Sequence, residues 1–137
     1  MIMIAAVDDN MGLMFNHRRL SQDHLLRKNI LEMTEGHRLW MNQYSYKQFC
    51  QGDDGPQINV DDSFMYEAAQ GDYVFVEDAP VKPHEEWIEK VILYKWNRKY
   101  PSDQKLDIDL SGWQLISTED FPGTSHEKIT KEVYIRA

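Results

Sequence analysis

Cysteine and histidine, which often serve as nucleophiles, bases or metal ligands, are few and widely spaced in this sequence. The single cysteine, Cys50, has no partner for a disulfide and no nucleophile-elbow motif beside it. The five histidines do not stand at a spacing typical of metal ligands, such as H-x-x-x-H; they are His17, His24, His37, His84 and His126. The sequence therefore predicts no metal site and no nucleophilic serine or cysteine.

Carboxylates are the most abundant reactive groups, and several stand in adjacent pairs. Three of these pairs are Asp53-Asp54, Asp61-Asp62 and Glu77-Asp78, and a basic run stands at His17-Arg18-Arg19. Such pairs could serve acid and base chemistry or meet a basic protein partner, although a solvated loop has the same composition. The basic run could meet an acidic ligand or simply be exposed to water.

The formal net charge of −8 restricts the partners of the chain. Nucleic acids and anionic membranes attract positive surfaces, so we expect neither as a direct partner. No apolar run approaches the roughly 20 residues that span a bilayer, and the amino terminus lacks the basic start of a secretory signal. Together with the lone cysteine, these features predict a cytoplasmic protein in a reducing compartment.

The amino-terminal half shows one buried strand followed by an amphipathic helix. Met1–Val7 is a continuous apolar run, which is typical of a strand covered on both faces. Ser21–Glu35 carries apolar residues at helical spacing, with Ser21 as the expected cap and Gly36 as the end. A short strand at Arg38–Met41 and a helical turn through Tyr46 and Phe49 follow.

The second half alternates short elements and ends in two strands. The turn residues of Gln51–Gln57 predict a loop, and Asp61 or Asp62 is expected to cap a short helix. Pro83 suits the first position of a further helix, with Glu85 and Glu86 in its first turn. The predicted short helix is Phe64–Gln70, and the predicted strands are Tyr73–Val76, Lys90–Tyr94, Trp113–Ser117 and Ile129–Ile135.

This order of elements predicts one α/β domain over residues 1–137. It implies a central, mostly parallel β-sheet flanked by helices, with an antiparallel carboxy-terminal hairpin. The chain length of 137 residues suits a single core.

Several short strings, in the same order and spacing, resemble the dihydrofolate reductase family. Ile4–Gly12 is similar to the family pattern I-A-A-V-D-x-N-x-G, and Leu20–Asp23 is similar to the helix start L-P-x-D. Gly36–Tyr46 is similar to G-H-x-L-V-M-G-R-x-T-[WYF]. The strand at Gly71–Val76 and the tail at Leu110–Trp113 and Glu132–Tyr134 add weaker matches.

The resemblance implies a pteridine pocket and a catalytic acid. Asp23 stands where the family has a carboxylate that binds the 2-amino-pyrimidinone edge of folate and helps to protonate the ring. The same residue could instead only favour the positive end of the helix. The other substrate-binding positions implied are Ala5, Ala6, Arg27, where the family tends to have Phe, and Tyr94, where it usually has Thr.

The departures from the family concern the NADPH site. Glu77-Asp78 replaces a Gly-Gly pair whose bare backbone approaches the pyrophosphate, and each buried like-charge contact would cost about 4 kcal/mol. Gln43 replaces an arginine that pairs with the ribose phosphate, and the loops before Asp23 and between Phe49 and Phe64 are short. The sequence therefore predicts no residue that binds a cofactor.

Three functions follow from these observations, and the sequence leaves open whether the chain is an enzyme. The first is a catalytically impaired, dihydrofolate reductase-like binding protein, or pseudoenzyme, without a cofactor, whose ligand is a folate-like molecule or a partner protein. The second is an active NADPH-dependent oxidoreductase of dihydrofolate or a related pteridine, with Asp23 as its acid. The third is an acidic inhibitor or immunity-type protein whose surface binds a basic protein.

Overall fold

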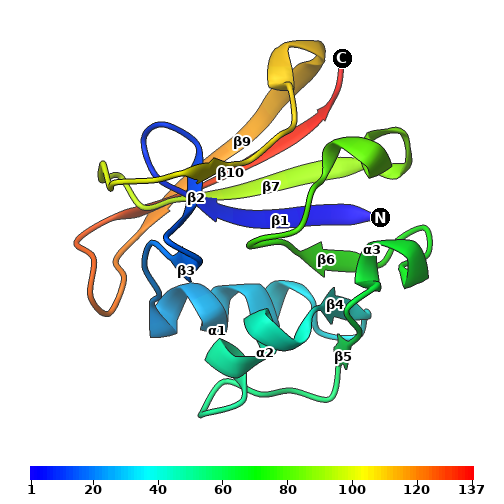
Figure 1. Cartoon of the computed structure of the whole chain (residues 1–137), viewed down its shortest axis with the longest axis horizontal. Helices are drawn as coiled ribbons and strands as arrows, with labels where there is room; N and C mark the ends of the chain where they lie inside the picture. Colours follow the sequence, from blue (N-terminus) through cyan, green and yellow to red (C-terminus); the bar gives the residue numbers. More distant parts are fainter.

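The computed structural model describes every residue of the chain, 1–137, as two β-sheets with short helices around them (Figure 1). The strands of the central sheet are β1 (Ile2–Val7), β4 (Leu39–Met41), β5 (Ile58–Val60), β6 (Tyr73–Phe75), β7 (Lys90–Lys95), β9 (Trp113–Phe121) and β10 (Ile129–Arg136). The smaller sheet contains β2 (Gly12–Phe15), β3 (Arg18–Arg19) and β8 (Gln104–Lys105). The helices are α1 (His24–Met33), α2 (Gln43–Phe49), α3 (Phe64–Glu67) and the 3-10 helices η1 (Lys82–Trp87) and η2 (Leu110–Gly112).

The central sheet has seven strands in the order β5-β4-β6-β1-β7-β10-β9. The first five run parallel, while β10 lies antiparallel to β7 and to β9. The predicted fold class is therefore confirmed: a mostly parallel sheet with helices and an antiparallel carboxy-terminal hairpin. None of the helices has the length and apolar character needed to cross a lipid bilayer.

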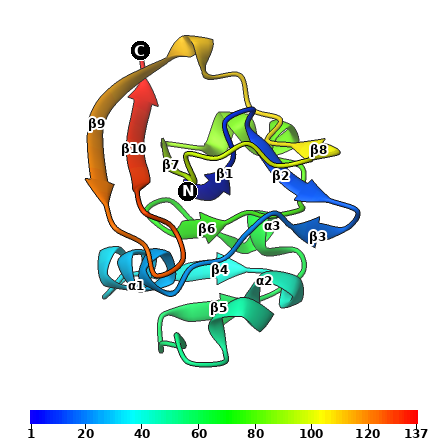
Figure 2. The ribbon, with the colours of Figure 1, turned by 90° about the vertical axis from the view of Figure 1, so that its left-hand side faces the viewer.

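The two faces of the sheet are covered by different elements, because successive strand residues point in opposite directions. On β1, Met3 and Ala5 pack with residues of the small sheet and α3 and with the residues that flank η1, whereas Ile4 packs with α1. Figure 2 shows α1 on one side of the central sheet and the β2–β3–β8 sheet on the other. Leu26 and Ile30, one helical turn apart, supply the buried face of α1.

Several local predictions were wrong. The first helix begins at His24 and not at Ser21, because Asp23 has the extended backbone of a cap and its side chain accepts two helix amides. Helix α3 ends at Glu67, and neither Asp61 nor Asp62 caps it. The loop between Phe49 and Phe64 contains a further edge strand, β5, and the segment before Asp23 contains the β2–β3 hairpin.

Candidate functional site

The carboxyl ends of the parallel strands meet at one edge of the central sheet. Asn42 follows β4, Glu77 comes two residues after β6, and Trp96 follows β7. In open α/β sheets, ligands bind at this edge. Two clusters of polar side chains lie near it, one around Asp23 and one around Glu77.

Asp23 joins the start of α1 to the turn between β9 and β10. Its Oδ1 atom accepts hydrogen bonds from the amides of Leu25 and Leu26, at 3.0 and 3.3 Å, and of Thr124, at 3.0 Å. Its Oδ2 atom accepts from the amide and hydroxyl of Ser125, at 2.9 and 3.1 Å, and from Nδ1 of His126, at 3.0 Å. Each carboxylate oxygen therefore already has three donors from the chain itself.

Burial and hydrogen bonding act in opposite directions on this carboxyl group. Burial would raise the pKa of Asp23, but the donors Thr124, Ser125 and His126 outweigh it and hold the pKa well below its usual value. The turn approaches so closely that a Cβ atom at Gly123 would lie 2.5 Å from Oδ2 of Asp23. The carboxylate is thus held charged and covered.

The contacts of His126 extend the Asp23 cluster in the order serine, histidine, carboxylate. A carboxylate can only accept, so Nδ1 of His126 carries a hydrogen, and its Nε2 atom lies 3.0 Å from Ser21 Oγ. This order activates the nucleophile of serine hydrolases. Here Tyr100 Oη also lies 3.3 Å from Nε2, and Trp96 stacks on the ring at 4.5 Å. Ser21 lines none of the four main cavities.

None of the other predicted pocket residues donates a hydrogen bond to the Asp23 side chain. Ala6 and Tyr94 are register partners on β1 and β7, and the Tyr94 hydroxyl donates to Asn29 of α1 at 2.5 Å. Ala5 lies in the cluster of apolar residues on the opposite face of the sheet. Arg27 instead pairs with a loop carboxylate, since its Nε atom lies 2.7 Å from Oδ2 of Asp53.

No main cavity opens at the predicted pocket. Its five predicted residues line none of the four main cavities; they are Ala5, Ala6, Asp23, Arg27 and Tyr94. Burial and the charge of Glu119 hold the pKa of Tyr94 far above its usual value, so its hydroxyl stays neutral. Their roles in catalysis and substrate binding therefore stay predictions.

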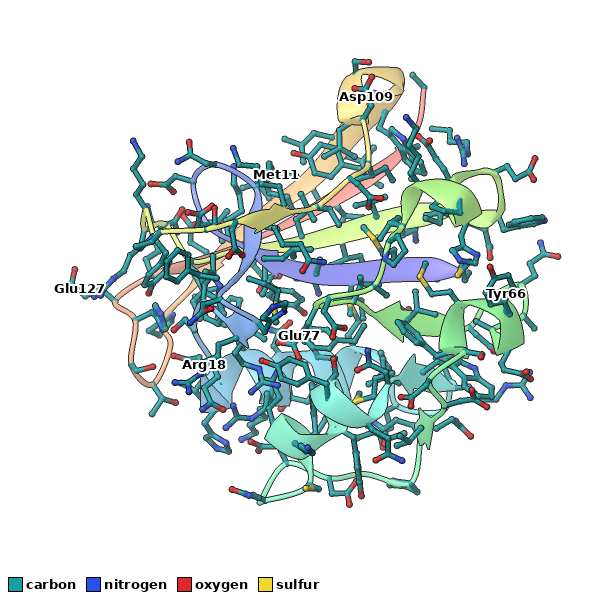
Figure 3. The ribbon with its side chains drawn as sticks, viewed as in Figure 1. Met11, Arg18, Tyr66, Glu77, Asp109 and Glu127 are labelled. Atoms are coloured by element: carbon teal, nitrogen blue, oxygen red, sulfur yellow. The ribbon has the colours of Figure 1, made fainter.

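Glu77 lies just beyond the end of β6 (Figure 3). Its side chain is buried and is neutralised by Arg19 of β3. The two groups form two hydrogen bonds, Nε to Oε2 at 2.9 Å and Nη2 to Oε1 at 3.2 Å, and Gln48 donates to Oε2 at 2.9 Å. The guanidinium also lies 4.4 Å from the centre of the Tyr44 ring. Burial opposes the charge of Arg19, but Glu77 outweighs it and holds the pKa of Arg19 above its usual value.

Asp78 and Asn42 close the adjacent strand end. Asn42 caps α2 by accepting from the Ser45 amide at 2.9 Å, and its Nδ2 atom donates to Asp78 at 2.8 Å. Gln104 of β8 donates to the backbone oxygen of Asp78 at 2.8 Å. The first turn of α2 is therefore capped from within the chain. No group of three or more metal-binding side chains converges anywhere in the structure.

Sequence reasoning missed the partners in both clusters. It identified Asp23 and Glu77, but not Ser125 and His126, and it left Arg19 in an isolated basic run. The polar run after Gly123 was a weak signal for a hydrogen-bonded turn. Nothing local in one sequence indicates which distant carboxylate such a turn contacts.

Comparison with known proteins supports the fold. No protein-family model matches the chain, and no curated protein matches it. Among solved structures, it is similar to a dihydrofolate reductase from Enterococcus faecalis complexed with NADP(H) and RAB-propyl. The TM-score is 0.66 at 13% sequence identity, and the match covers 98% of this chain and 96% of that one. This likeness shows a dihydrofolate reductase-like fold.

Proposed function

We propose that this dihydrofolate reductase-like protein does not reduce dihydrofolate with NADPH and works as a binding protein. The observation that carries the proposal is the Arg19–Glu77–Gln48 contact at the end of β6. This contact lies at the strand end where the resemblance implies that the pyrophosphate of the coenzyme would bind. The N–H donors of Arg19 and Gln48, which could otherwise bind phosphate, are hydrogen-bonded to Glu77 instead.

The obstacle to the coenzyme differs in kind from simple charge repulsion. Arg19 neutralises Glu77, so an approaching diphosphate would have to separate a buried ion pair. Breaking such a pair by removing one partner costs about 3–5 kcal/mol in proteins. The Glu77 side chain also fills space that a glycine would leave to the ligand.

The Asp23 cluster supports the same proposal from the substrate side. A pteridine would need both oxygens of Asp23 to accept its N–H groups, but three internal donors already contact each oxygen. A folate-like ligand in that pose requires the β9–β10 turn to leave the carboxylate. We therefore expect folate analogues to bind weakly at this place.

Titration with NADPH tests the proposal. We expect no saturable heat of binding at micromolar NADPH and no oxidation of NADPH in the presence of dihydrofolate, with a known dihydrofolate reductase as the positive control. Saturation or turnover would establish the active NADPH-dependent reductase instead. If turnover were lost in Asp23→Asn, this residue would be its acid.

The acidic inhibitor is less well supported, because all three of these acidic pairs are partly used within the chain. Asp61 and Asp62 accept hydrogen bonds from the amides of Ser63 and Gln43. Asp53 contacts His24 and Arg27, and Glu77 contacts Arg19. Asp54 and Asp62 remain exposed, so a basic protein partner would have to meet them. Co-purification of a basic protein that is lost on Asp54→Asn and Asp62→Asn would favour this function over the first.

A further inference from the structure

A cavity of about 390 Å³ lies at the amino ends of β1 and β7, away from both clusters described above. Its walls include Met1, Met65, Tyr66, His84, Trp87 and Glu89. Figure 3 shows Tyr66 beyond the start of β6 and Glu77 beyond the other end of that strand. The volume lies within the range of small-molecule sites.

Two large aromatic side chains at this cavity are exposed to solvent. Tyr66 is 78% exposed and Trp87 is 57% exposed, while Met1 and Met65 are buried in the apolar wall. Aromatic rings at the rim and apolar side chains beneath offer flat contact surfaces to a planar molecule. The shape and apolarity of the site therefore favour an aromatic ligand over a flexible polar one.

His84 gives the cavity a polar group that nothing in the chain satisfies. The residue is 5% exposed, and its ring packs edge-on against Tyr66 at 4.6 Å between centroids. Its side chain forms no hydrogen bond, and the only fully buried side-chain polar atom without a partner is Ser45 Oγ. The ring nitrogens of His84 are therefore not sealed inside the protein, and because His84 lines the cavity, its imidazole can form hydrogen bonds with a ligand there.

Glu89 adds an acceptor at the same cavity. Its Oε2 atom accepts from the amino-terminal ammonium of Met1, at 2.8 Å, and from the Gly71 amide, at 2.9 Å. Its Oε1 atom has no hydrogen bond within the chain, and the side chain is 39% exposed. A ligand with an N–H group can therefore meet a carboxylate oxygen as well as the imidazole.

We propose that this cavity is a binding site for a small planar heteroaromatic molecule with ring nitrogen donors and acceptors. The rings of Tyr66 and Trp87 contact its faces, and His84 binds its nitrogen atoms. The site is separate from the predicted pteridine pocket, so the proposal holds whether or not the protein reduces dihydrofolate.

The test uses benzimidazole and benzothiophene, which share ring size but differ in hydrogen-bonding nitrogens. Each is titrated into the ¹⁵N-labelled full chain, and amide shifts are followed for the native protein, His84→Phe and His84→Gln. We expect benzimidazole to shift the amides of Tyr66, His84 and Trp87. The preference for benzimidazole over benzothiophene should fall about tenfold in His84→Phe and be largely kept in His84→Gln, since tenfold corresponds to one hydrogen bond.

Two further variants separate the cavity from general adhesion to the surface. Trp87→Ala should weaken both probes, whereas Phe15→Ala, which removes another exposed aromatic ring on β2, should change neither. Shifts that spread over the whole surface, or none at the cavity up to the solubility limit, would overturn the proposal. An unchanged preference in folded His84→Phe would overturn the role of His84. If that variant does not fold, the native shift map and Trp87→Ala decide.

Discussion

Nδ1 of His126 lies 3.0 Å from Oδ2 of Asp23, although the two residues are 103 positions apart in the chain. This contact links the turn of the last hairpin to the beginning of the first helix. Because the two partners are far apart in the sequence, the Asp23 cluster stabilises the packing of the carboxy-terminal hairpin against the amino-terminal half. The following predictions test that role.

Replacement of Asp23 by asparagine should destabilise the protein strongly. The variant keeps the size of the side chain, but its amide nitrogen would face donors and its oxygen would lose the charge that strengthens six hydrogen bonds. We expect the free energy of unfolding to fall by about 2–4 kcal/mol, measured by denaturant unfolding at neutral pH. Glu67→Gln, at an exposed site, is the control; a loss at Asp23 no larger than in that control would contradict the structural role.

The stability of the protein should fall in acid, and Asp23 should account for part of the fall. Its folded pKa is depressed, so its contribution is complete above the unfolded value of about 3.9 and is lost as the pH falls below it. Asp8, Asp53 and Asp72 also have lowered pKa values, so the native chain and the Asp23→Asn variant should both lose stability in acid. Unfolding measured between about pH 5 and pH 2 should show a shallower decline for Asp23→Asn than for the native chain. Parallel curves would refute the assignment.

Gly123→Ala should separate the hairpin turn from Asp23. An added Cβ would lie 2.5 Å from Oδ2 of Asp23 and 2.8 Å from the Cδ1 atom of Ile129, so the turn must move. We expect a loss of about 1–3 kcal/mol and a changed environment for the His126 ring, measured by unfolding and by NMR of the imidazole. Gly112→Ala is the matched control, because nothing lies within 4 Å of its added Cβ. Equal stability of the two variants would show that the turn adapts freely.

Ser21 should not react as a hydrolase nucleophile. Its hydroxyl contacts His126, but Tyr100 competes for the same ring nitrogen, and Ser21 lines none of the four main cavities. We expect a fluorophosphonate probe to leave the intact mass of the protein unchanged, with a known serine hydrolase labelled in parallel. Stoichiometric labelling that disappears in Ser21→Ala would reverse this interpretation and assign an acyl-transfer activity.

The fold could be predicted where burial leaves a pattern in the sequence. The apolar runs at Met1–Val7 and Lys90–Tyr94 correspond to β1 and β7, which are covered on both faces. Strand β9 extends to Phe121, beyond the predicted end at Ser117. The prediction stopped too early because most residues of β9 are exposed and show no apolar alternation. The β2–β3 hairpin was missed because Asn16 and His17 make its turn with positive φ angles and without glycine.

The candidate site could be predicted less well from the sequence, because its geometry depends on contacts between segments that are distant in the chain. Both Ser21 and Asp23 can cap a helix, and only the position of the β9–β10 turn shows why Asp23 does so. Likewise, the sequence shows Glu77 only as an acidic residue in place of a family glycine, whereas the structure shows that it forms an ion pair with Arg19. Contacts of this kind leave no local trace in a single chain.

The Arg19–Glu77 pair should be strongly coupled, and a double-mutant cycle can measure the coupling. Glu77→Gln leaves a half-buried guanidinium without its counter-charge, and Arg19→Met leaves a buried carboxylate without a cation, so each single change should cost about 2–4 kcal/mol. The double variant should cost less than the sum by about 1–3 kcal/mol, as measured by denaturant unfolding. The ion pair between Lys95 and Glu132, 3.8 Å apart and more exposed, is the control and should show coupling below about 1 kcal/mol. Additive losses at Arg19 and Glu77 would mean that the pair does not hold the β3 segment against β6, and the main obstacle to a coenzyme at that strand end would be removed.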